Sequence, residues 1–294
     1  MESLPTPIIT IDDPLLAAKG VRLMVKREDL NHPIISGNKW RKLKYNLLEA
    51  KKQGYARLLT FGGAYSNHIY ATAGAGKEFG FETIGIIRGE EHVPLNPTLS
   101  FAKEAGMHLQ YMDRSTYRRK SESEIINLFK QQYGDFYLIP EGGTNPLAVQ
   151  GCAEIIQEID TDHDYLCCPV GTGGTVAGLI SGLKGKSSVI GFSSLKGDFL
   201  KGEVANLLGQ INCHADNWSI NVDYHFGGYA KTKPALLDFM KAFEKQHQIP
   251  LDPIYTAKMM FGIYELIQSG FFPEGAKVLA MHTGGLQGRA GFGI

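Results

Sequence analysis

The chain alternates between short apolar runs and longer amphipathic ones. The short runs are rich in β-branched residues, as expected of buried strands, and occupy residues 57–61, 83–88, 136–140, 165–170, 189–193 and 278–282. Patterns with a helical period lie between them, over residues 44–53, 121–133, 147–159, 233–247 and 258–269. Strands that alternate with helices usually pair in parallel, with crossover helices on both faces of the sheet. The pattern therefore predicts an α/β fold.

The organisation along the chain indicates two lobes. No internal repeat, low-complexity segment or long Pro/Gly/Ser linker interrupts the 294 residues, which are enough to bury a full core. We expect two open, twisted, mostly parallel sheets flanked by helices, with an organic ligand in the cleft between a larger and a smaller domain near the carboxyl ends of the strands. The larger domain is predicted to comprise residues 1–45 and 156–294, with residues 46–155 as the smaller inserted domain.

Composition narrows the class of partner. The 30 basic residues balance 30 acidic ones, and no basic tract is present, so a nucleic acid or a membrane surface is not an expected partner. No apolar run approaches the ~20 residues of a membrane span, and the N-terminus lacks the features of a signal peptide. The four cysteines form no CxxC pair and no metal-ligand spacing with histidine. We interpret all four as buried thiols of a cytoplasmic protein and expect no metal.

Lys39 is the first candidate for chemistry. It follows Gly37-Asn38 and precedes Trp40, a context in which a lysine can be shielded from water and its pKa lowered. Two neighbouring cations, Arg41 and Lys42, are expected to lower the pKa further. A neutral amine is what an enzyme needs to hold an aldehyde cofactor as a Schiff base, although most lysines are only solvated charges.

A glycine-rich turn follows the predicted strand at residues 165–170. Its sequence is Gly171-Thr172-Gly173-Gly174-Thr175, and it opens a helix, so backbone amides and the helix N-terminus can hold a phosphate. The dinucleotide pattern G-x-G-x-x-G fails because Val176 replaces its last glycine. Gly185-Lys186-Ser187 is not a Walker A loop, since Ile180 replaces the leading glycine. The remaining interpretations are a cradle for one isolated phosphate and a plain tight turn.

A second polar cluster follows the predicted strand at residues 57–61. Ser66, Asn67 and His68 stand at the start of a small-residue helix, where free amides and the helix dipole favour a carboxylate. Simple helix capping is the alternative, and it explains one of the three residues.

Together these segments resemble the D-cysteine desulfhydrase / 1-aminocyclopropane-1-carboxylate (ACC) deaminase family of pyridoxal-phosphate enzymes, which has the tryptophan synthase β-like fold (fold type II). The similarity is carried in order by residues 26–30 (Lys-Arg-Glu-Asp-Leu), 36–43 (Ser-Gly-Asn-Lys-Trp-Arg-Lys-Leu), 66–68, 171–175 and 283–285. It extends over nearly the whole chain, and the Gly-Asn-Lys-Trp-Arg-Lys-Leu string is its most specific part.

The resemblance implies a role for each matching residue. Lys39 would carry pyridoxal 5′-phosphate and move the Cα proton, and the turn from Gly171 to Thr175 would hold the phosphate. Asn67 would bind the 3′ oxygen of the pyridine ring, and Ser66 and His68 the substrate carboxylate. Two tyrosines would line the site, Tyr255 and the less well matched Tyr229, after which Ala230 replaces the family's usual glycine.

The two branches of the family differ at two positions. By this resemblance, deaminases have Glu at the position of Thr256 and Leu at the position of Thr283, whereas desulfhydrases have Ser or Thr at both. This chain therefore resembles the desulfhydrases at both positions. We assign Thr256 to the substrate site and Thr283 to the cofactor site. A carboxylate beside the pyridine nitrogen would favour its protonated form and a strong electron sink, whereas a threonine makes a weaker one. A weaker sink suffices when a good β leaving group departs, so ACC deamination is not expected.

The resemblance therefore implies a lyase that acts on a small amino acid by α,β-elimination, with D-cysteine as the expected substrate and a homodimer as the expected assembly. Related alternatives are action on D-serine, a β-chloro amino acid or ACC, and a non-enzymatic alternative is an idle sensor that binds pyridoxal phosphate. Three residues depart from the family pattern beside Ser66, namely Tyr65, Ile69 and Tyr70, and they are expected at the substrate wall.

Overall fold

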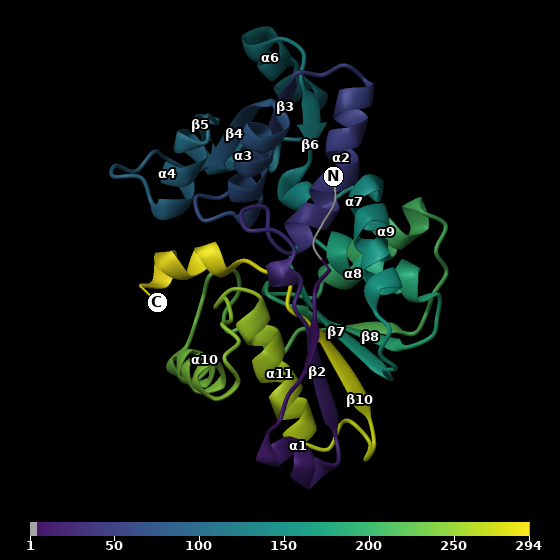
Figure 1. The fold of residues 1–294 in the computed structure, drawn as a ribbon. Helices are drawn as coiled ribbons and strands as arrows, with labels where there is room; N and C mark the ends of the chain where they lie inside the picture. Colours follow the sequence, from purple (N-terminus) through teal and green to yellow (C-terminus); the bar gives the residue numbers. More distant parts are fainter. Residues whose placement is uncertain (1–4, 294) are drawn as a thin grey trace.

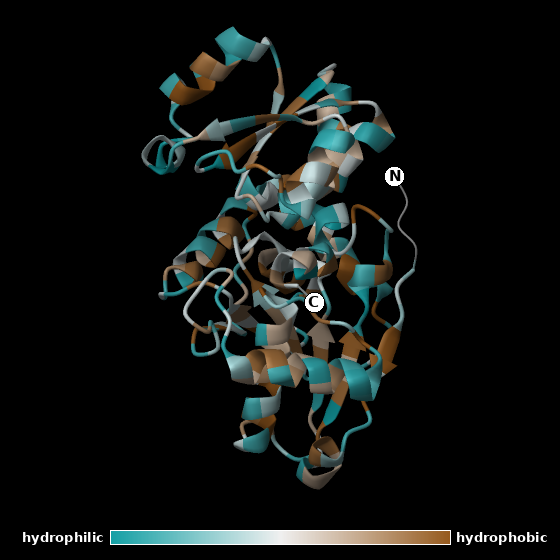
Figure 2. Ribbon diagram, turned by 90° about the vertical axis from the view of Figure 1, so that its left-hand side faces the viewer, coloured by the Kyte–Doolittle hydropathy of each residue, from teal (hydrophilic) through white to brown (hydrophobic). Residues whose placement is uncertain are grey.

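The structure, a computed structural model, describes residues 5–293 and consists of two lobes. In Figure 1 the lower lobe surrounds strands β2, β7, β8 and β10, and the upper lobe surrounds β3 to β6. The hydropathy colouring in Figure 2 shows brown, apolar strands inside each lobe and teal segments mainly on the helices and loops around them. This is the layered α/β arrangement that the alternating pattern predicts.

The larger sheet has six strands in the order β1-β2-β10-β7-β8-β9. All neighbouring strands are parallel except the edge pair β1 and β2. The strands are β1 (Ile8–Thr10), β2 (Arg22–Lys26), β7 (Tyr165–Val170), β8 (Ser188–Ser193), β9 (Trp218–Asn221) and β10 (Lys277–Met281). In the central register, Leu279 of β10 lies between Met24 and Leu166.

The smaller sheet has four parallel strands in the order β5-β4-β3-β6. They are β3 (Arg57–Gly62), β4 (Glu82–Arg88), β5 (His108–Met112) and β6 (Tyr137–Ile139), all of which fall between β2 and β7 in the chain. The predicted fold of two mostly parallel sheets flanked by helices is thus confirmed. The domain boundaries near residues 45 and 155 stay a prediction.

Helices cover both faces of each sheet. They are α1 (Pro14–Lys19), α2 (Asn38–Lys52), α3 (Asn67–Phe79), α4 (Pro97–Glu104), α5 (Arg114–Arg118), α6 (Ser123–Tyr133), α7 (Pro146–Ala153), α8 (Gly174–Leu183), α9 (Leu200–Gln210), α10 (Pro234–His247) and α11 (Thr256–Gln268), with 3₁₀ turns η1 (Glu28–Leu30), η2 (Glu141–Gly143), η3 (Glu154–Glu158) and η4 (Leu286–Phe292). Three helices begin with proline directly after a residue whose side chain accepts a backbone N–H bond, namely Asp13, Asn96 and Asn145. This is a favourable N-terminus, because proline has no N–H to leave unpaired.

Side chains on the strands pack alternately into the layers on either side. In β7, Leu166 and Cys168 belong to the core beneath α8, whereas Cys167 belongs to the core beneath α11. In β3, Leu58 packs with α2, and Leu59 packs with α6. Both faces of each sheet are covered, so these strands are apolar throughout rather than alternating with polar residues.

Four strands escaped the sequence prediction. They are β1, β2, β5 and β9, which are short or carry charged and polar residues. Pairing with a neighbouring strand keeps the polar ones extended, whereas β2 has a buried apolar centre, residues 23–25, between two basic residues. The helix predicted over residues 147–159 is two pieces, α7 and η3. The buried-thiol prediction holds for three cysteines, whereas Cys213 is partly exposed.

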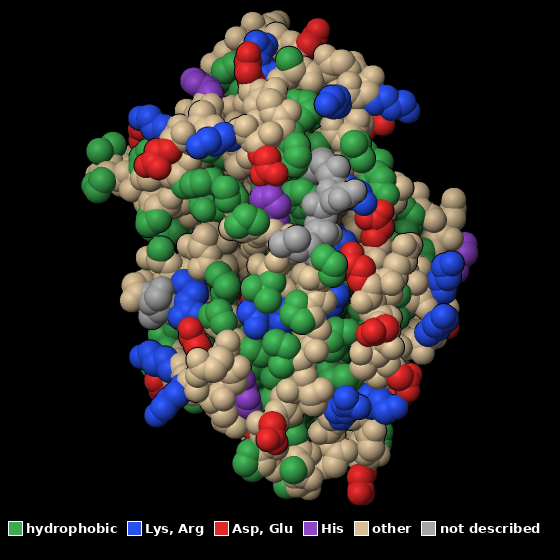
Figure 3. Space-filling model, in the orientation of Figure 1, with side chains coloured by type: hydrophobic (Ala, Val, Ile, Leu, Met, Phe, Trp, Pro, Cys, Tyr) green, Lys and Arg blue, Asp and Glu red, His purple; other side chains and the backbone are tan. Residues whose placement is uncertain are grey.

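The surface carries charges of both signs. Figure 3 shows lysine and arginine side chains interspersed with acidic ones over one face, in keeping with the formal net charge of zero. Among the described residues, no helix has the length and apolar character needed to cross a membrane.

Candidate active site

Helix α2 begins against the carboxyl end of β10. The Asn38 amide donates a 3.1 Å hydrogen bond to the Thr283 carbonyl oxygen. Gly37 adopts a φ of 70°, and a Cβ there would lie only 2.0 Å from that oxygen. Only glycine permits this approach, which brings Lys39 close to Thr283 although the two are far apart in the sequence.

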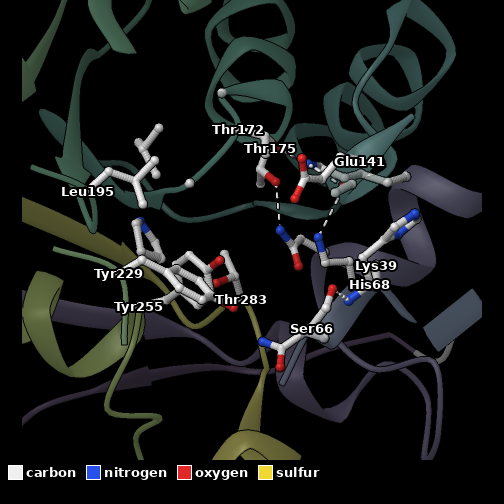
Figure 4. Close-up of a pocket in the computed structure, with 18 of the residues that line it drawn as sticks. Lys39, Ser66, His68, Glu141, Thr172, Thr175, Leu195, Tyr229, Tyr255 and Thr283 are labelled. Atoms are coloured by element: carbon white, nitrogen blue, oxygen red, sulfur yellow. Dashed lines mark hydrogen bonds between the residues drawn. The ribbon is translucent and has the colours of Figure 1, made fainter. Parts of the chain in front are cut away.

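A cavity of about 530 Å³ opens between the lobes at this point. Eleven of the residues that the sequence assigned to the site line it, namely Lys39, Ser66, Asn67, His68, Gly171, Thr172, Gly173, Thr175, Tyr229, Tyr255 and Thr283. Figure 4 shows Lys39, Ser66 and His68 on one side and Tyr229, Tyr255 and Thr283 on the other, with Thr172 and Thr175 between the two sides at the back. Gly174 and Thr256 do not line the cavity.

Lys39 has the electrostatic environment that its sequence context predicted. Burial lowers the pKa of its amine well below the usual value, and the nearby charge of Lys42 lowers it further. Its Nζ donates a 3.1 Å hydrogen bond to the Gly142 carbonyl oxygen of η2. The side chain is therefore an amine held at a defined position in the cavity, with its neutral form favoured.

Arg41 does not contribute to this shift as expected. Arg41 points to the side of α2 that faces away from the cavity. There its guanidinium forms ion pairs with Glu28 at 2.9 Å and with Glu158 at 2.6 Å. Both contacts join α2 to segments of the larger lobe. Residues two apart on a helix point to different sides, so adjacency in the sequence overstated the effect of Arg41 on Lys39.

Lys42 is a site residue whose role the sequence left unassigned. One turn after Lys39, its Nζ lies 2.9 Å from the Thr144 hydroxyl, 3.3 Å from the Thr172 hydroxyl and 3.2 Å from the Gly142 carbonyl oxygen. Burial lowers the pKa of this amine. The spacing of three residues on one helix was the available signal, since it places both lysines on the same face.

The glycine-rich turn leaves its backbone open toward the cavity. A Cβ at Gly171 would lie 2.9 Å from Cε1 of Tyr255, and one at Gly174 would lie 3.2 Å from the Lys42 Nζ. Gly173 has a φ of 83°, which L side chains rarely adopt. Because α8 begins here, its free amides and positive dipole end are available to an anion beside Lys42.

The polar residues at the start of α3 have separate tasks. Ser66 caps the helix, with Oγ accepting from the His68 and Ile69 amides at 3.2 and 3.3 Å. The Asn67 side-chain oxygen accepts a 2.7 Å bond from Gln287 in η4. Capping and a cavity-lining position are thus combined in Ser66, so the two interpretations of this segment are compatible.

His68 is held in one tautomer by a buried chain of hydrogen bonds. The Thr60 hydroxyl donates to the Ile139 carbonyl oxygen at 2.8 Å, and it must therefore accept from Nε2 of His68, which lies 2.7 Å away. Burial and the two lysines lower the pKa of His68 well below its usual value. The ring is consequently neutral, so any contact with a carboxylate would lack the support of a positive charge.

Tyr229 and Tyr255 form an aromatic pair in the cavity wall. Their ring centroids are 6.2 Å apart, with planes at 65°. Burial raises the pKa of both hydroxyls. They are protonated at neutral pH and can therefore donate hydrogen bonds.

Thr256 lies behind this wall. It is fully buried at the start of α11, where its hydroxyl lies 2.7 Å from a carboxylate oxygen of Asp252. Asp252 also accepts the amides of Ile254 and Tyr255. The structure therefore places Thr256 in a buried hydrogen-bonded turn with Asp252 and does not bring it to the cavity with Thr283.

The three departures from the family pattern are also outside the cavity. Ile69 is buried in the core, and the Tyr70 ring stacks on Phe101 at 3.9 Å. Tyr65 is 40% exposed and packs near Gly291. The expectation that these side chains form the substrate wall is wrong, because α3 directs Ile69 and Tyr70 into the small lobe, whereas Tyr65, which precedes the helix, lies toward η4.

The small lobe contributes instead a group of polar side chains. Arg88 at the end of β4, Lys120 after α5 and Glu141 in η2 all line the cavity. Lys120 and Glu141 form an ion pair at 3.1 Å. No sequence pattern joins these three residues, and only the tertiary fold brings them together.

These residues fit pyridoxal phosphate. Lys39 supplies an amine for an aldehyde, Lys42 and the Gly171–Thr175 turn supply cation, amides and hydroxyls for a phosphate, and Thr283 supplies a hydroxyl on the opposite side. The glycines leave space that a side chain would fill, which is the requirement for close backbone approach to a phosphate.

Comparisons with known proteins agree with this assignment. The family model described as "Pyridoxal-phosphate dependent enzyme" matches residues 2–284. A putative ACC deaminase of Pyrococcus horikoshii is 32% identical over 93% of this chain and 87% of its own length. A bifunctional D-cysteine desulfhydrase/ACC deaminase, mitochondrial, of Arabidopsis thaliana is 31% identical over 97% of this chain and 77% of its own length.

The fold of a solved structure is also similar to this chain over nearly its whole length. The crystal structure of an ACC deaminase homologue superimposes with a TM-score of 0.86 and 28% identity, covering 99% of this chain and 92% of the other. The two folds therefore correspond over nearly their full lengths. The chain therefore belongs to the pyridoxal-phosphate-dependent lyases of the ACC deaminase / D-cysteine desulfhydrase family.

Proposed function

We propose that the protein converts D-cysteine to pyruvate, ammonia and sulfide by α,β-elimination. Pyridoxal phosphate supplies an electron sink for the charge that develops on Cα when its proton is removed. The side chains of the cavity bind the amino acid, orient it and move the proton.

Lys39 is the proposed base. Burial and the charge of Lys42 lower its pKa and so favour the neutral amine, and the Gly142 carbonyl oxygen holds Nζ in place. A charged ammonium has no lone pair to accept the Cα proton, so burial is what makes this lysine useful.

The start of α3 is the proposed site for the α-carboxylate. Ser66 and Asn67 line the cavity at the positive end of the helix dipole, which favours an anion. Tyr229 and Tyr255 stand on the opposite side as protonated donors. The substrate would thus lie between the carboxylate site and the tyrosines.

Thr283 is the observation that carries the choice of D-cysteine over ACC. The resemblance assigns Thr283 to the pyridine ring of the cofactor, and in support of this assignment the residue lines the cavity. The nearby carboxylate of Asp252 does not line the cavity and is engaged by Thr256 and backbone amides. A hydroxyl supports a weaker electron sink than a carboxylate, which suits a substrate with a good leaving group.

A substrate comparison tests the proposal. Purified protein with bound pyridoxal phosphate is incubated with D-cysteine, D-serine, β-chloro-D-alanine and ACC, and sulfide, pyruvate and 2-oxobutyrate are measured. We expect sulfide and pyruvate from D-cysteine and little or no 2-oxobutyrate from ACC. Efficient ACC turnover would reject the branch assignment, and a stable visible spectrum without any product would support the sensor alternative.

The Thr283→Val variant sharpens the test. It keeps the shape of the side chain but removes the hydroxyl, and we expect the rate with D-cysteine to fall about 10-fold or more, as for loss of one hydrogen bond to a reacting system. Thr72→Val is the matched control, because Thr72 is buried with no partner for its hydroxyl among the described residues and does not line the cavity. Equal rates for the wild type and Thr283→Val would remove the argument from this hydroxyl.

We also propose that the protein acts as a homodimer in the cytoplasm. The support is the family resemblance, together with four cysteines that form no disulfide with one another. Light scattering coupled to size exclusion should give twice the 32.3 kDa mass of the chain.

A further inference from the structure

The cavity lies against one cation that the proposed chemistry does not use. Four basic side chains line it, namely Lys39, Lys42, Arg88 and Lys120. Lys39 is the proposed base, Lys42 lies at the phosphate cradle, and Lys120 is paired with Glu141. Among residues 5–293, the side chain of Arg88 has no hydrogen bond or ion pair. It is the one lining cation for which neither a protein group nor the cofactor provides a partner.

Arg88 is exposed, and its side chain lines the cavity beside an aromatic ring. The central carbon of its guanidinium lies 5.9 Å from the ring centroid of Tyr117, and the Lys120 Nζ lies 4.8 Å from the same centroid. Tyr117 is 3% exposed, so it forms a fixed platform for the two cations. Glu141, a carboxylate that also lines the cavity, forms its ion pair with Lys120 and not with Arg88.

Arg88 is also near the groups proposed to react. A Cβ at Gly63, three residues before Ser66, would lie 3.7 Å from a terminal nitrogen of Arg88. Burial raises the pKa of Tyr229, and the positive charge of Arg88 partly opposes this rise. Glu141 directly precedes Gly142, whose carbonyl oxygen accepts a hydrogen bond from Lys39. The guanidinium thus borders the cavity near both the start of α3 and Tyr229, between which the substrate is proposed to lie.

We propose that Arg88 is a specificity-determining residue that binds the substrate's β-substituent as an anion, so that the substrate class extends to amino acids with a sulfonate or phosphate ester on Cβ. The inference rests on the proposed elimination and adds a subsite for its leaving group. A guanidinium presents parallel N–H donors that match the oxygens of such groups, and it is always charged. A thiolate would be bound by the same charge with fewer hydrogen bonds.

The reaction balances for these substrates. Lys39 takes the Cα proton, the bond from Cβ to sulfur or oxygen breaks, and the electron pair leaves with the substituent as sulfite or phosphate. The remaining 2-aminoacrylate takes up water and yields pyruvate and ammonia. No oxidant or reductant is needed.

Kinetics with matched substrates test the role of Arg88. Both enantiomers of cysteate and O-phosphoserine are compared with β-chloroalanine, which is similar in size to cysteine but has a neutral substituent. We expect Arg88→Met to raise KM for the anionic substrates by about 10- to 100-fold, the loss of a charged hydrogen-bonding partner, and to change KM for β-chloroalanine by less than about twofold. Arg88→Lys should restore part of the affinity.

Arg114→Met is the matched control, because Arg114 is exposed, close to Gly89 and outside the cavity lining. An equal loss for all substrates would place the α-carboxylate on Arg88 and overturn the inference. No change for any substrate would show that Arg88 is only a solvated charge, and would also overturn it.

A binding measurement separates this inference from the proposed function. Calorimetry with 3-sulfopropionate, which has no amino group and cannot react, should show binding to the holoenzyme that Arg88→Met weakens about 10-fold or more. If this holds while no substrate is turned over, the elimination fails and the anion subsite stands. If β-chloroalanine is turned over and binding of 3-sulfopropionate is absent or independent of Arg88, the subsite fails and the elimination stands.

Discussion

The basic side chains on two faces of helix α2 have pKa values that are shifted in opposite directions. On the cavity face, burial lowers the pKa of Lys39 and Lys42, and neither amine has a carboxylate as a hydrogen-bonding partner. On the other face, Glu28 and Glu158 engage Arg41 and raise its pKa above its already high value. One face keeps amines reactive and open to a ligand, and the other neutralises a cation that only holds the lobes together.

The comparison shows how one helix can serve catalysis and stability at once. Charging a buried amine that has no carboxylate partner costs free energy, so such amines are typically found at sites where a ligand binds. A buried cation with two carboxylates needs no ligand, but removing either partner leaves an uncompensated charge. The two faces should therefore respond differently to substitution.

The largest expected effect is on the cavity face. Lys39→Ala should reduce turnover by about 10³-fold or more, because it removes both the attachment point and a base that is itself worth about 10²–10⁴-fold. The visible absorbance of bound pyridoxal phosphate should disappear after dialysis, while the circular dichroism spectrum and the melting temperature of the cofactor-free protein are retained. Persistence of the absorbance band would identify a different lysine as the anchor.

The opposite face should affect stability first. Arg41→Met leaves Glu28 buried without its cation, and we expect the free energy of unfolding to fall by about 3–5 kcal/mol in urea titrations. Cofactor affinity of the folded fraction should change by less than about twofold. Lys52→Met is the control on the same helix, since its side chain is 80% exposed and its contact to Glu49 is 4.0 Å, so the expected change is within about 0.5 kcal/mol. A large loss of cofactor affinity in Arg41→Met would mean that the two faces are not independent.

The smallest effect is a pH dependence of the cofactor-free protein. The pKa of Lys39 lies below the usual 10.5 in the folded state, so between the lowered pKa and 10.5 the unfolded chain binds more protons than the folded one. Unfolding free energy should then increase with pH in this window, by up to about 1.4 kcal/mol per pH unit for each such lysine, and this contribution is lost as the pH falls. Lys39→Met should flatten the slope measured by urea unfolding between about pH 7 and pH 9.5. An unchanged slope would show that the pKa of the Lys39 amine is not lowered in the folded state.

Much of the cofactor site could be predicted because it is contiguous. Its parts are short segments that lie directly after a strand or at the start of a helix, namely Lys39, the Gly171–Thr175 turn and residues 66–68. Local geometry of this kind depends on nearby residue types, such as glycines that leave the backbone open and a helix N-terminus that favours an anion. Thr256 was misplaced because the sequence could not show that Asp252 would bind its hydroxyl.

The sequence by itself determined the alternation of strands and helices, and it identified the glycine-rich turn and the lysine that line the cavity, because these follow from short-range patterns and backbone freedom. Only the tertiary structure decided which side chains surround the substrate. Arg88, Lys120 and Glu141 come from separate elements of the small lobe, and they meet only when its sheet and helices pack. It also decided that Arg41 turns to the carboxylates while Lys39 turns to the cavity, since the direction of a side chain depends on what packs against each face of its helix.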